Sequence, residues 1–184
     1  MKSTFGVIAA ALLSTPAFAL SGVQVSAGAG AGNFTRDLSS DSGTGAAYGA
    51  MVAFQPADLL GLEVAYDGIT AGNNSPLATN SRLNANGVKG DLKVNLAPGA
   101  VEPYLFGGAG FYHLSETGAA PGFSTANSFA VPVGAGVNAH ISDAFLIGAR
   151  FTYDLLFQTG DFRPGLSANT DLYTATINIG GILR

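Results

Sequence analysis

The sequence contains no cysteine, and this absence excludes a disulfide-bonded scaffold. A lipoprotein carries its lipid on a cysteine at the cleavage site, so we expect no lipid anchor of that kind. Charged residues are also scarce, at 11% of the chain, whereas ordinary globular domains contain about 25%. So small a charged fraction is unusual for a domain that is surrounded by water.

Long apolar runs are missing as well. Although 47% of the residues are hydrophobic, no run of about 18 apolar residues follows residue 19, which excludes a membrane protein built from helices. A membrane barrel combines a high hydrophobic content with an absence of long apolar runs, because apolar and polar residues alternate along its strands. The net charge of −4 and the lack of a basic patch indicate no nucleic-acid partner.

The first 19 residues have the three parts of a secretory signal peptide. Lys2 supplies a positive charge, residues 5–13 are apolar, and Ala17-Phe18-Ala19 resembles a cleavage site. The apolar stretch is too short to span a bilayer as a helix. We therefore predict that residues 1–19 are a cleaved signal peptide and that residues 20–184 form one domain.

The rest of the sequence contains eight segments in which apolar and polar positions alternate, as in strands with two different faces. The predicted strands are 22–34, 45–55, 60–70, 83–96, 102–114, 128–141, 144–157 and 172–183. Short turns alternate with longer polar connections between them. The turns are 55–59, 97–100 and 142–143, and the long connections are 36–44, 71–82, 115–127 and 158–171. In outer-membrane barrels the short turns face the periplasm, so both termini are expected there.

Segment 83–96 shows most clearly which face carries charge. Val88, Leu92, Val94 and Leu96 share one face, whereas Lys89, Asp91 and Lys93 share the opposite face. Charges that face lipid are costly, so we expect the charged face to line the lumen. The same reasoning predicts a lumen charge network made of Glu63, Asp67, Lys89, Asp91, Lys93, Arg150 and Asp154.

The interior of an eight-stranded barrel is just wide enough for side chains to fill it. We therefore expect these charges to pair and to plug the lumen, because unpaired charges in a narrow space are costly. A narrow pore or gated channel is the alternative.

Outward aromatic residues gather near the ends of the predicted strands, as in the two aromatic girdles of a membrane barrel. The predicted girdle residues are Tyr48, Phe54, Tyr66, Phe111, Phe129, Phe145, Tyr153 and Tyr173. A water-soluble, lipocalin-like barrel would have the opposite sidedness, with an apolar interior. The clustering of aromatic residues at strand ends argues against that alternative.

Three Gly-rich and aromatic stretches resemble strands of the OmpA-like and opacity-type outer-membrane barrels. They are 102–112 (EPYLFGGAGFY), 133–138 (VGAGVN) and 145–153 (FLIGARFTY). The resemblance implies an all-β fold, an eight-stranded antiparallel up-and-down transmembrane barrel that is apolar outside and polar inside. It also implies insertion by the outer-membrane assembly machinery. Chains of this family commonly end in an aromatic residue, whereas this sequence ends in Ile182-Leu183-Arg184.

One short pattern has the residue types of a hydrolase. His113 and Ser115 share the outward face of a predicted strand, and Glu116 follows. A His base beside a Ser nucleophile can cleave an ester, and a lipid A-modifying hydrolase of eight-stranded architecture uses such a pair. The asparagine that follows in that enzyme family is absent here. We therefore expect no enzyme. Neither a second histidine nor a cysteine accompanies His140, so we also expect no metal site and no cofactor.

These observations predict an integral outer-membrane protein with a structural or surface-interaction role, such as envelope integrity or adhesion through four extracellular loops. A small porin or transporter of small or apolar solutes is the first alternative, and the lipid A hydrolase is the lesser one. The expected partners are outer-membrane lipid and lipopolysaccharide, the assembly machinery, and an extracellular partner at the loops.

Overall fold

The computed structural model describes residues 22–36, 42–72, 81–118, 125–158 and 170–183, and these form eight strands. The strands are β1 (Val23–Arg36), β2 (Gly45–Ala57), β3 (Leu60–Gly72), β4 (Arg82–Asn95), β5 (Val101–Thr117), β6 (Ala126–Ser142), β7 (Phe145–Gln158) and β8 (Thr170–Leu183). The predicted signal peptide, 1–19, and large parts of the four long connections lie outside the described residues.

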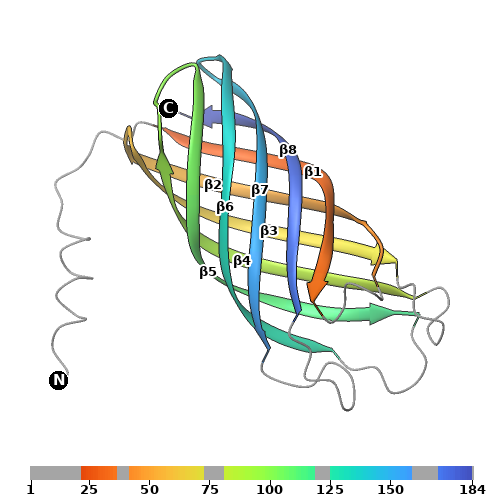
Figure 1. The fold of residues 1–184 in the computed structure, drawn as a ribbon. Coiled ribbons are helices and arrows are strands. Elements are labelled where there is room, and N and C mark those ends of the chain that lie inside the picture. Colours follow the sequence, from red (N-terminus) through yellow and green to blue (C-terminus); the bar gives the residue numbers. More distant parts are fainter. Residues whose placement is uncertain (1–21, 37–41, 73–80, 119–124, 159–169, 184) are drawn as a thin grey trace, which may run out of the picture.

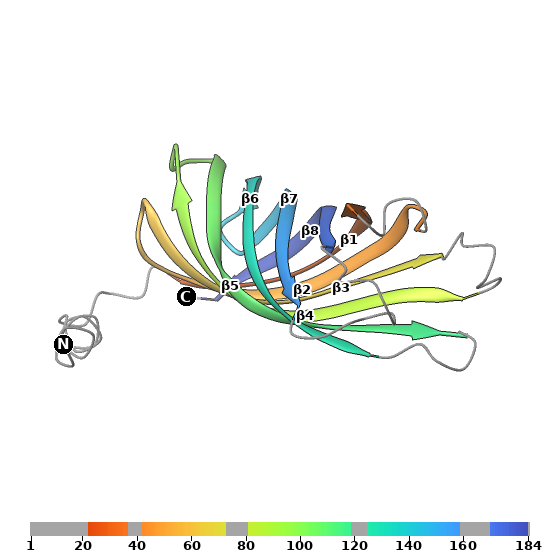
Figure 2. The ribbon, with the colours of Figure 1, turned by 60° about the horizontal axis from the view of Figure 1, so that its bottom comes forward.

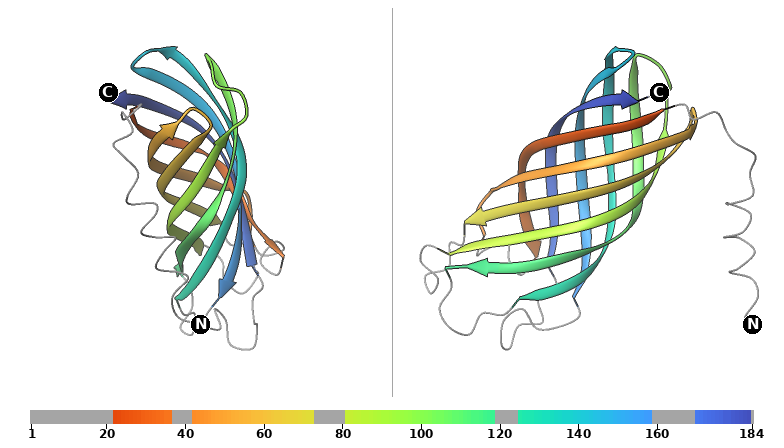
Figure 3. Two further views of the ribbon diagram at one scale, coloured as in Figure 1. Left: turned by 90° about the vertical axis from the view of Figure 1, so that its left-hand side faces the viewer. Right: turned by 180° about the vertical axis from the view of Figure 1, so that it is seen from behind.

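The eight strands form a closed antiparallel barrel in which each strand pairs with its neighbours in sequence and β8 pairs with β1 (Figure 1). The closing register runs from Val23 opposite Leu183 to Arg36 opposite Thr170, and the view from behind shows these two strands side by side (Figure 3). Closure leaves the sheet without a free edge, as a sheet in lipid requires. The predicted fold is confirmed.

The barrel has two different ends. The three short connections, the start of β1 and the end of β8 lie at one end, which we call the turn end. The strands meet the long connections at the other, the loop end, and a tilted view separates the two (Figure 2). Several strands run two or three residues farther toward the loop end than predicted, such as β5, which reaches Thr117 instead of 114.

The outer surface carries large apolar side chains from every strand. Among the most exposed are Phe111 at 68%, Val64 at 61% and Ile177 at 60%. Water-soluble monomers rarely leave such an extensive apolar surface uncovered, so this one is suited to lipid. No helix long and apolar enough to cross a membrane occurs among the described residues.

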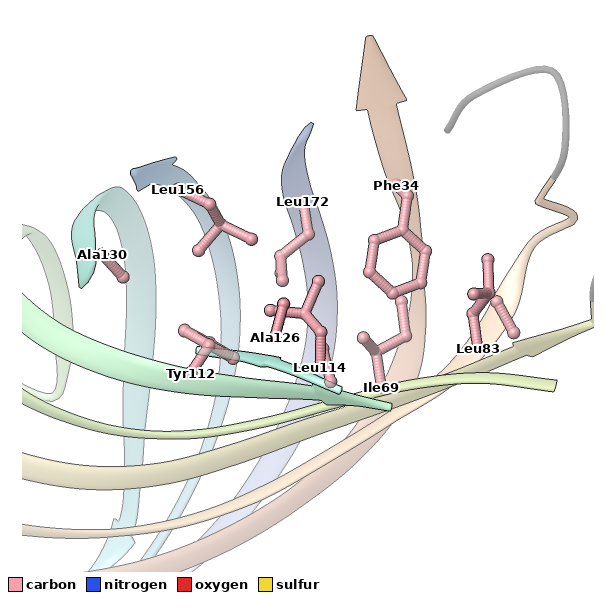
Figure 4. Close-up of a cluster of buried hydrophobic side chains, with 11 residues drawn as sticks. Phe34, Ile69, Leu83, Tyr112, Leu114, Ala126, Ala130, Leu156 and Leu172 are labelled. Atoms are coloured by element: carbon pink, nitrogen blue, oxygen red, sulfur yellow. The ribbon is translucent and has the colours of Figure 1, made fainter. Parts of the chain in front are cut away.

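The interior contains an apolar cluster near the loop end, which we call the apolar cap (Figure 4). Every strand except β2 contributes to it, and the side chains point toward one another inside the ring of strands. Its members are Phe34, Ile69, Ala71, Leu83, Ala85, Tyr112, Leu114, Ala126, Ala130, Leu156 and Leu172. The sequence reasoning, which expected a polar interior, did not anticipate this cluster.

A buried carboxylate joins three strands near the apolar cap. The paired register of β7 and β8 ends at Asp154 opposite Leu172. Beyond that point Asp171 accepts hydrogen bonds from the backbone N–H of Leu156 at 3.1 Å and from the hydroxyl of Tyr153 at 2.9 Å. Its Oδ2 also lies 2.6 Å from Nε of Arg36 on β1. Asp171 therefore accepts a hydrogen bond from the backbone N–H of Leu156, which lies beyond the paired register of β7 and β8.

Candidate functional site

The middle of the barrel interior contains the charged residues that the sequence placed there, and Arg150 on β7 is at their centre. Its Nη1 donates to Oε2 of Glu63 on β3 at 2.6 Å, and its Nη2 donates to Oδ2 of Asp91 on β4 at 3.1 Å. The guanidinium carbon lies 3.4 Å from the ring centroid of Phe106. One arginine thus neutralises two carboxylates across the lumen and also stacks on an aromatic ring.

A second group of charges surrounds Lys89 on β4. The ammonium of Lys89 pairs with Asp67 on β3 and with Asp154 on β7, whose Oδ1 is 3.3 Å away. The hydroxyl of Tyr112 donates to the other oxygen of Asp154 at 3.3 Å. Lys89 and Asp154 are 1% and 0% exposed. Buried charges are tolerated only when paired and hydrogen-bonded in this way.

Lys93 is the third cation of this charge cluster, a name we use for the seven predicted lumen charges. Its Nζ has no hydrogen-bond partner among the described residues and lies 4.6 Å from the ring centroid of Tyr104. An ammonium over the face of a tyrosine ring is attracted by the ring quadrupole. The structure therefore brings six of the seven charges into ion pairs and places Lys93 against an aromatic face.

Glycines on β6 make room for the aromatic rings of β5 that fill the lumen. Tyr104 is in register with Gly136, and Phe106 with Gly134. A Cβ atom at either glycine would clash with the ring that faces it. The bare backbone therefore lets the two rings lie flat against the wall and support the neighbouring cations, a use of glycine that close approach requires.

At the turn end the interior opens into a cavity of about 570 Å³. Its wall includes Gln24, Gln55, Asp58, Glu102 and His140. His140 Nδ1 lies 3.1 Å from the carbonyl oxygen of Gly99, and its Nε2 lies 3.8 Å from Oε2 of Glu102. Glu102, only 8% exposed, is an interior acid that the sequence reasoning missed, although its spacing from Tyr104 and Phe106 places it on the same face.

Nothing in the described part of the chain forms a group of three or more histidine, cysteine or acidic residues able to hold a metal. The expectation that the protein has no cofactor and no metal stays a prediction.

The three weak catalytic candidates do not come together. His113 lies exposed on the outer surface, where its Nδ1 is 2.9 Å from Oδ1 of Asn127. Ser115 is on the same face of β5. Glu116 faces the interior instead, where its Oε1 accepts a hydrogen bond from Ser81 at 2.5 Å. Alternation along a strand separates Glu116 from the other two, because neighbouring side chains point to opposite faces.

The predicted girdle residues all point away from the lumen, but they differ in their contacts. Phe111 and Phe129 form an edge-to-face pair with centroids 5.5 Å apart, and Phe151 stacks on Tyr173 at 6.2 Å. Tyr48 and Tyr66 make hydrogen bonds on the outer surface. The other three are Phe54, Phe145 and Tyr153.

Comparison with known proteins identifies the family. The model of the outer membrane protein beta-barrel domain matches residues 5–181. The chain belongs to this family. Members of the outer-membrane barrel family are integral to the outer membrane, and so is this protein. No curated protein matches the sequence.

Three solved outer-membrane barrels have similar structures. Neisserial surface protein A (NspA) has a TM-score of 0.68 at 16% identity, and the match covers 86% of this chain and 96% of that one. OprG from Pseudomonas aeruginosa has a TM-score of 0.64 at 15% identity, with 90% and 97% covered. Ail, the attachment invasion locus protein of Yersinia pestis, has a TM-score of 0.60 at 13% identity, with 88% and 98% covered. Identities this low show a shared fold alone.

Proposed function

We propose that this chain is a non-conducting outer-membrane barrel with a structural or surface-interaction role. The observation that carries the proposal is the filled cross-section of the interior. Arg150, Glu63 and Asp91 connect β7 to β3 and β4 across the lumen, and the apolar cap lies between them and the loop end. A solute or ion crossing the barrel would have to separate buried ion pairs and then enter an apolar layer, and both steps are costly.

The turn end faces the periplasm in this proposal, and the loop end faces outside. Short turns at the periplasmic end and longer loops outside are the general arrangement in outer-membrane barrels. The start of β1 and the end of β8 both lie at the turn end. Surface contact with an extracellular partner is then made at the loop end, in keeping with the names of two similar barrels, a surface protein and an attachment protein.

Planar-bilayer recording tests the closed interior. We expect wild-type protein, folded and inserted, to show no steady conductance, because the charge cluster and the apolar cap occupy the lumen in series. A large porin recorded under the same conditions is the control that insertion can be detected. Stable, repeated openings from the wild-type chain would support the small-porin alternative and contradict this proposal.

Cysteine labelling tests the orientation, since the natural chain has no cysteine to give background. Thr117→Cys places an exposed thiol at the loop end of β5, and Ala100→Cys places one in an exposed turn. On intact cells a membrane-impermeant maleimide should label the first variant at once. It should label the second only after the outer membrane is permeabilised, and the reverse pattern would invert the orientation.

A further inference from the structure

The outward face of β3 to β6 changes from apolar to polar between two successive rows of side chains. Register partners across these strands and β7 form an aromatic and apolar row, made of Tyr66, Val88, Phe111, Phe129 and Phe157. Two residues closer to the loop end, a second row spans β2 to β6. We call it the polar row, and its members are Tyr48, Gly68, Asn86, His113 and Asn127.

Hydrogen bonds join side chains of the polar row in two places, and one of these also includes Tyr66 of the aromatic row. The hydroxyl of Tyr48 donates to Oδ1 of Asn86 at 2.8 Å, and the hydroxyl of Tyr66 donates to the same oxygen at 3.0 Å. Farther along the row, His113 Nδ1 is 2.9 Å from Oδ1 of Asn127. These side chains are attached to paired strands, so the row is a rigid arrangement of polar groups on the barrel surface.

Gly68 allows Tyr48 to lie flat across the neighbouring strand. Tyr48 is in register with Gly68 on β3, and Gly68 is in register with Asn86 on β4. A Cβ atom at Gly68 would clash with the Tyr48 ring. The ring therefore passes over bare backbone to reach Asn86, and 40% of Tyr48 remains exposed. The result is an open aromatic face beside a set of amide and hydroxyl groups.

A further polar row lies beyond the first, toward the loop end. Thr70 donates to Oδ1 of Asn84 at 2.9 Å, and Nδ2 of Asn84 donates to the hydroxyl of Thr117 at 3.0 Å. Arg82, which is exposed, is the cation of this region. Polar side chains on two rows of the outer wall cannot be surrounded by hydrocarbon, where each unsatisfied group costs several kcal/mol.

At the level where the outer wall becomes polar, the interior of the barrel becomes apolar. Ile69, Ala85, Leu114 and Ala126, which alternate with the polar residues along their strands, are all buried in the apolar cap. This part of the wall is apolar inside and polar outside, which is the sidedness of a barrel in an aqueous or headgroup layer. The hydrocarbon boundary therefore lies between the aromatic row and the polar row.

We propose that the polar row binds the core saccharide of lipopolysaccharide, the sugars attached to lipid A in this glycolipid of the outer leaflet. This inference rests on the proposed orientation, in which the loop end faces outside. The row adjoins the lipid-facing surface and so lies where headgroups begin. Its amide, imidazole and phenol groups complement sugar hydroxyls, and the face of Tyr48 can receive the apolar face of a sugar ring.

Native mass spectrometry of the folded chain in detergent tests the proposal with three probes. The probes are lipopolysaccharide with a short core saccharide, lipid A, which keeps only its glucosamine disaccharide, and phosphatidylglycerol. We expect wild-type protein to bind the first probe more tightly than the other two. The double variant Asn86→Ala/His113→Ala should lose at least about tenfold in affinity for that probe, the worth of one or two hydrogen bonds. Its affinity for lipid A should not change.

Gly68→Val is an independent test that removes no polar group, because it displaces the Tyr48 ring alone. Like the double variant, it should lower the affinity for the lipopolysaccharide probe. Ser142→Ala, an exposed residue at the turn end, is the matched control and should bind like wild type. Equal affinity of wild type for lipopolysaccharide and lipid A would overturn the proposal, as would unchanged binding by the double variant.

These outcomes are separate from those of the proposed function. Binding in detergent does not depend on which way the barrel is inserted or on whether its lumen conducts. A conducting or inverted barrel that still prefers the saccharide probe would contradict the proposed function and leave the polar row as a binding surface.

Discussion

Replacing Arg150 by alanine should lower the free energy of unfolding by about 3–5 kcal/mol, the usual cost of removing one partner from a buried ion pair. Glu63 and Asp91 would each keep a buried carboxylate without the cation that now lies 2.6 and 3.1 Å away. The stacking on Phe106 would be lost as well. Urea unfolding in phospholipid vesicles, followed by far-UV circular dichroism, measures the change.

Two further variants separate the loss of charge pairing from other effects of the substitution. Arg82→Ala removes an exposed arginine and should change the unfolding free energy by less than about 1 kcal/mol, as is typical of exposed charges. The triple variant Arg150→Met, Glu63→Gln and Asp91→Asn removes the two carboxylate charges together with the guanidinium and should recover most of the loss. If Arg150→Ala were no more costly than Arg82→Ala, the charge cluster would not be a closed and buried network.

Replacing Phe34 by alanine should cost about 3–5 kcal/mol, which is typical of a phenylalanine removed from a packed core. Phe34 is 2% exposed and packs in the apolar cap, where it points toward side chains from other strands (Figure 4). The same urea unfolding measurement reports the loss.

Phe111→Ala is the matched control for Phe34→Ala, because it makes the same substitution on the lipid-facing surface, at 68% exposure. Acyl chains can fill the space that it leaves, since lipid tails are as apolar as the side chain that was removed. We expect a clearly smaller loss of stability. Equal losses for the two variants would mean that the interior at the loop end is not a packed core.

The sidedness of the middle of the barrel could be predicted because it depends only on local alternation. Lys89, Asp91 and Lys93 occupy every second position of one segment, and no rotation of a strand can place them on the same face as Val88. Three charges exposed to lipid would be prohibitively costly, so their direction followed without knowledge of any other strand.

The pairing of those charges could not be predicted in the same way. Arg150 meets Glu63, which is 87 residues away in sequence, and Lys89 meets Asp154, 65 residues away. These contacts cross the lumen between strands that are not neighbours in the sheet. They depend on closure, on strand tilt and on the stagger of the register, none of which a single segment encodes.

The loop end is where sequence reasoning and structure differ most. Positions such as Thr117 and Asn127 fall within the predicted connection 115–127, because this stretch is rich in polar residues. They belong to β5 and β6, and the inward residues of these strand ends, Leu114 and Ala126, pack in the apolar cap. The alternation continues beyond the hydrocarbon layer, but there the apolar side chains point inward and the polar side chains point outward.

By itself, the sequence determined that the chain forms eight alternating strands with charges inside and apolar side chains outside, because side-chain direction in a strand repeats every two residues. The tertiary structure alone decided which charges pair across the lumen, where an apolar cap forms, and where the outer wall becomes polar. Those features depend on closure and register, which bring distant segments to one level of the barrel.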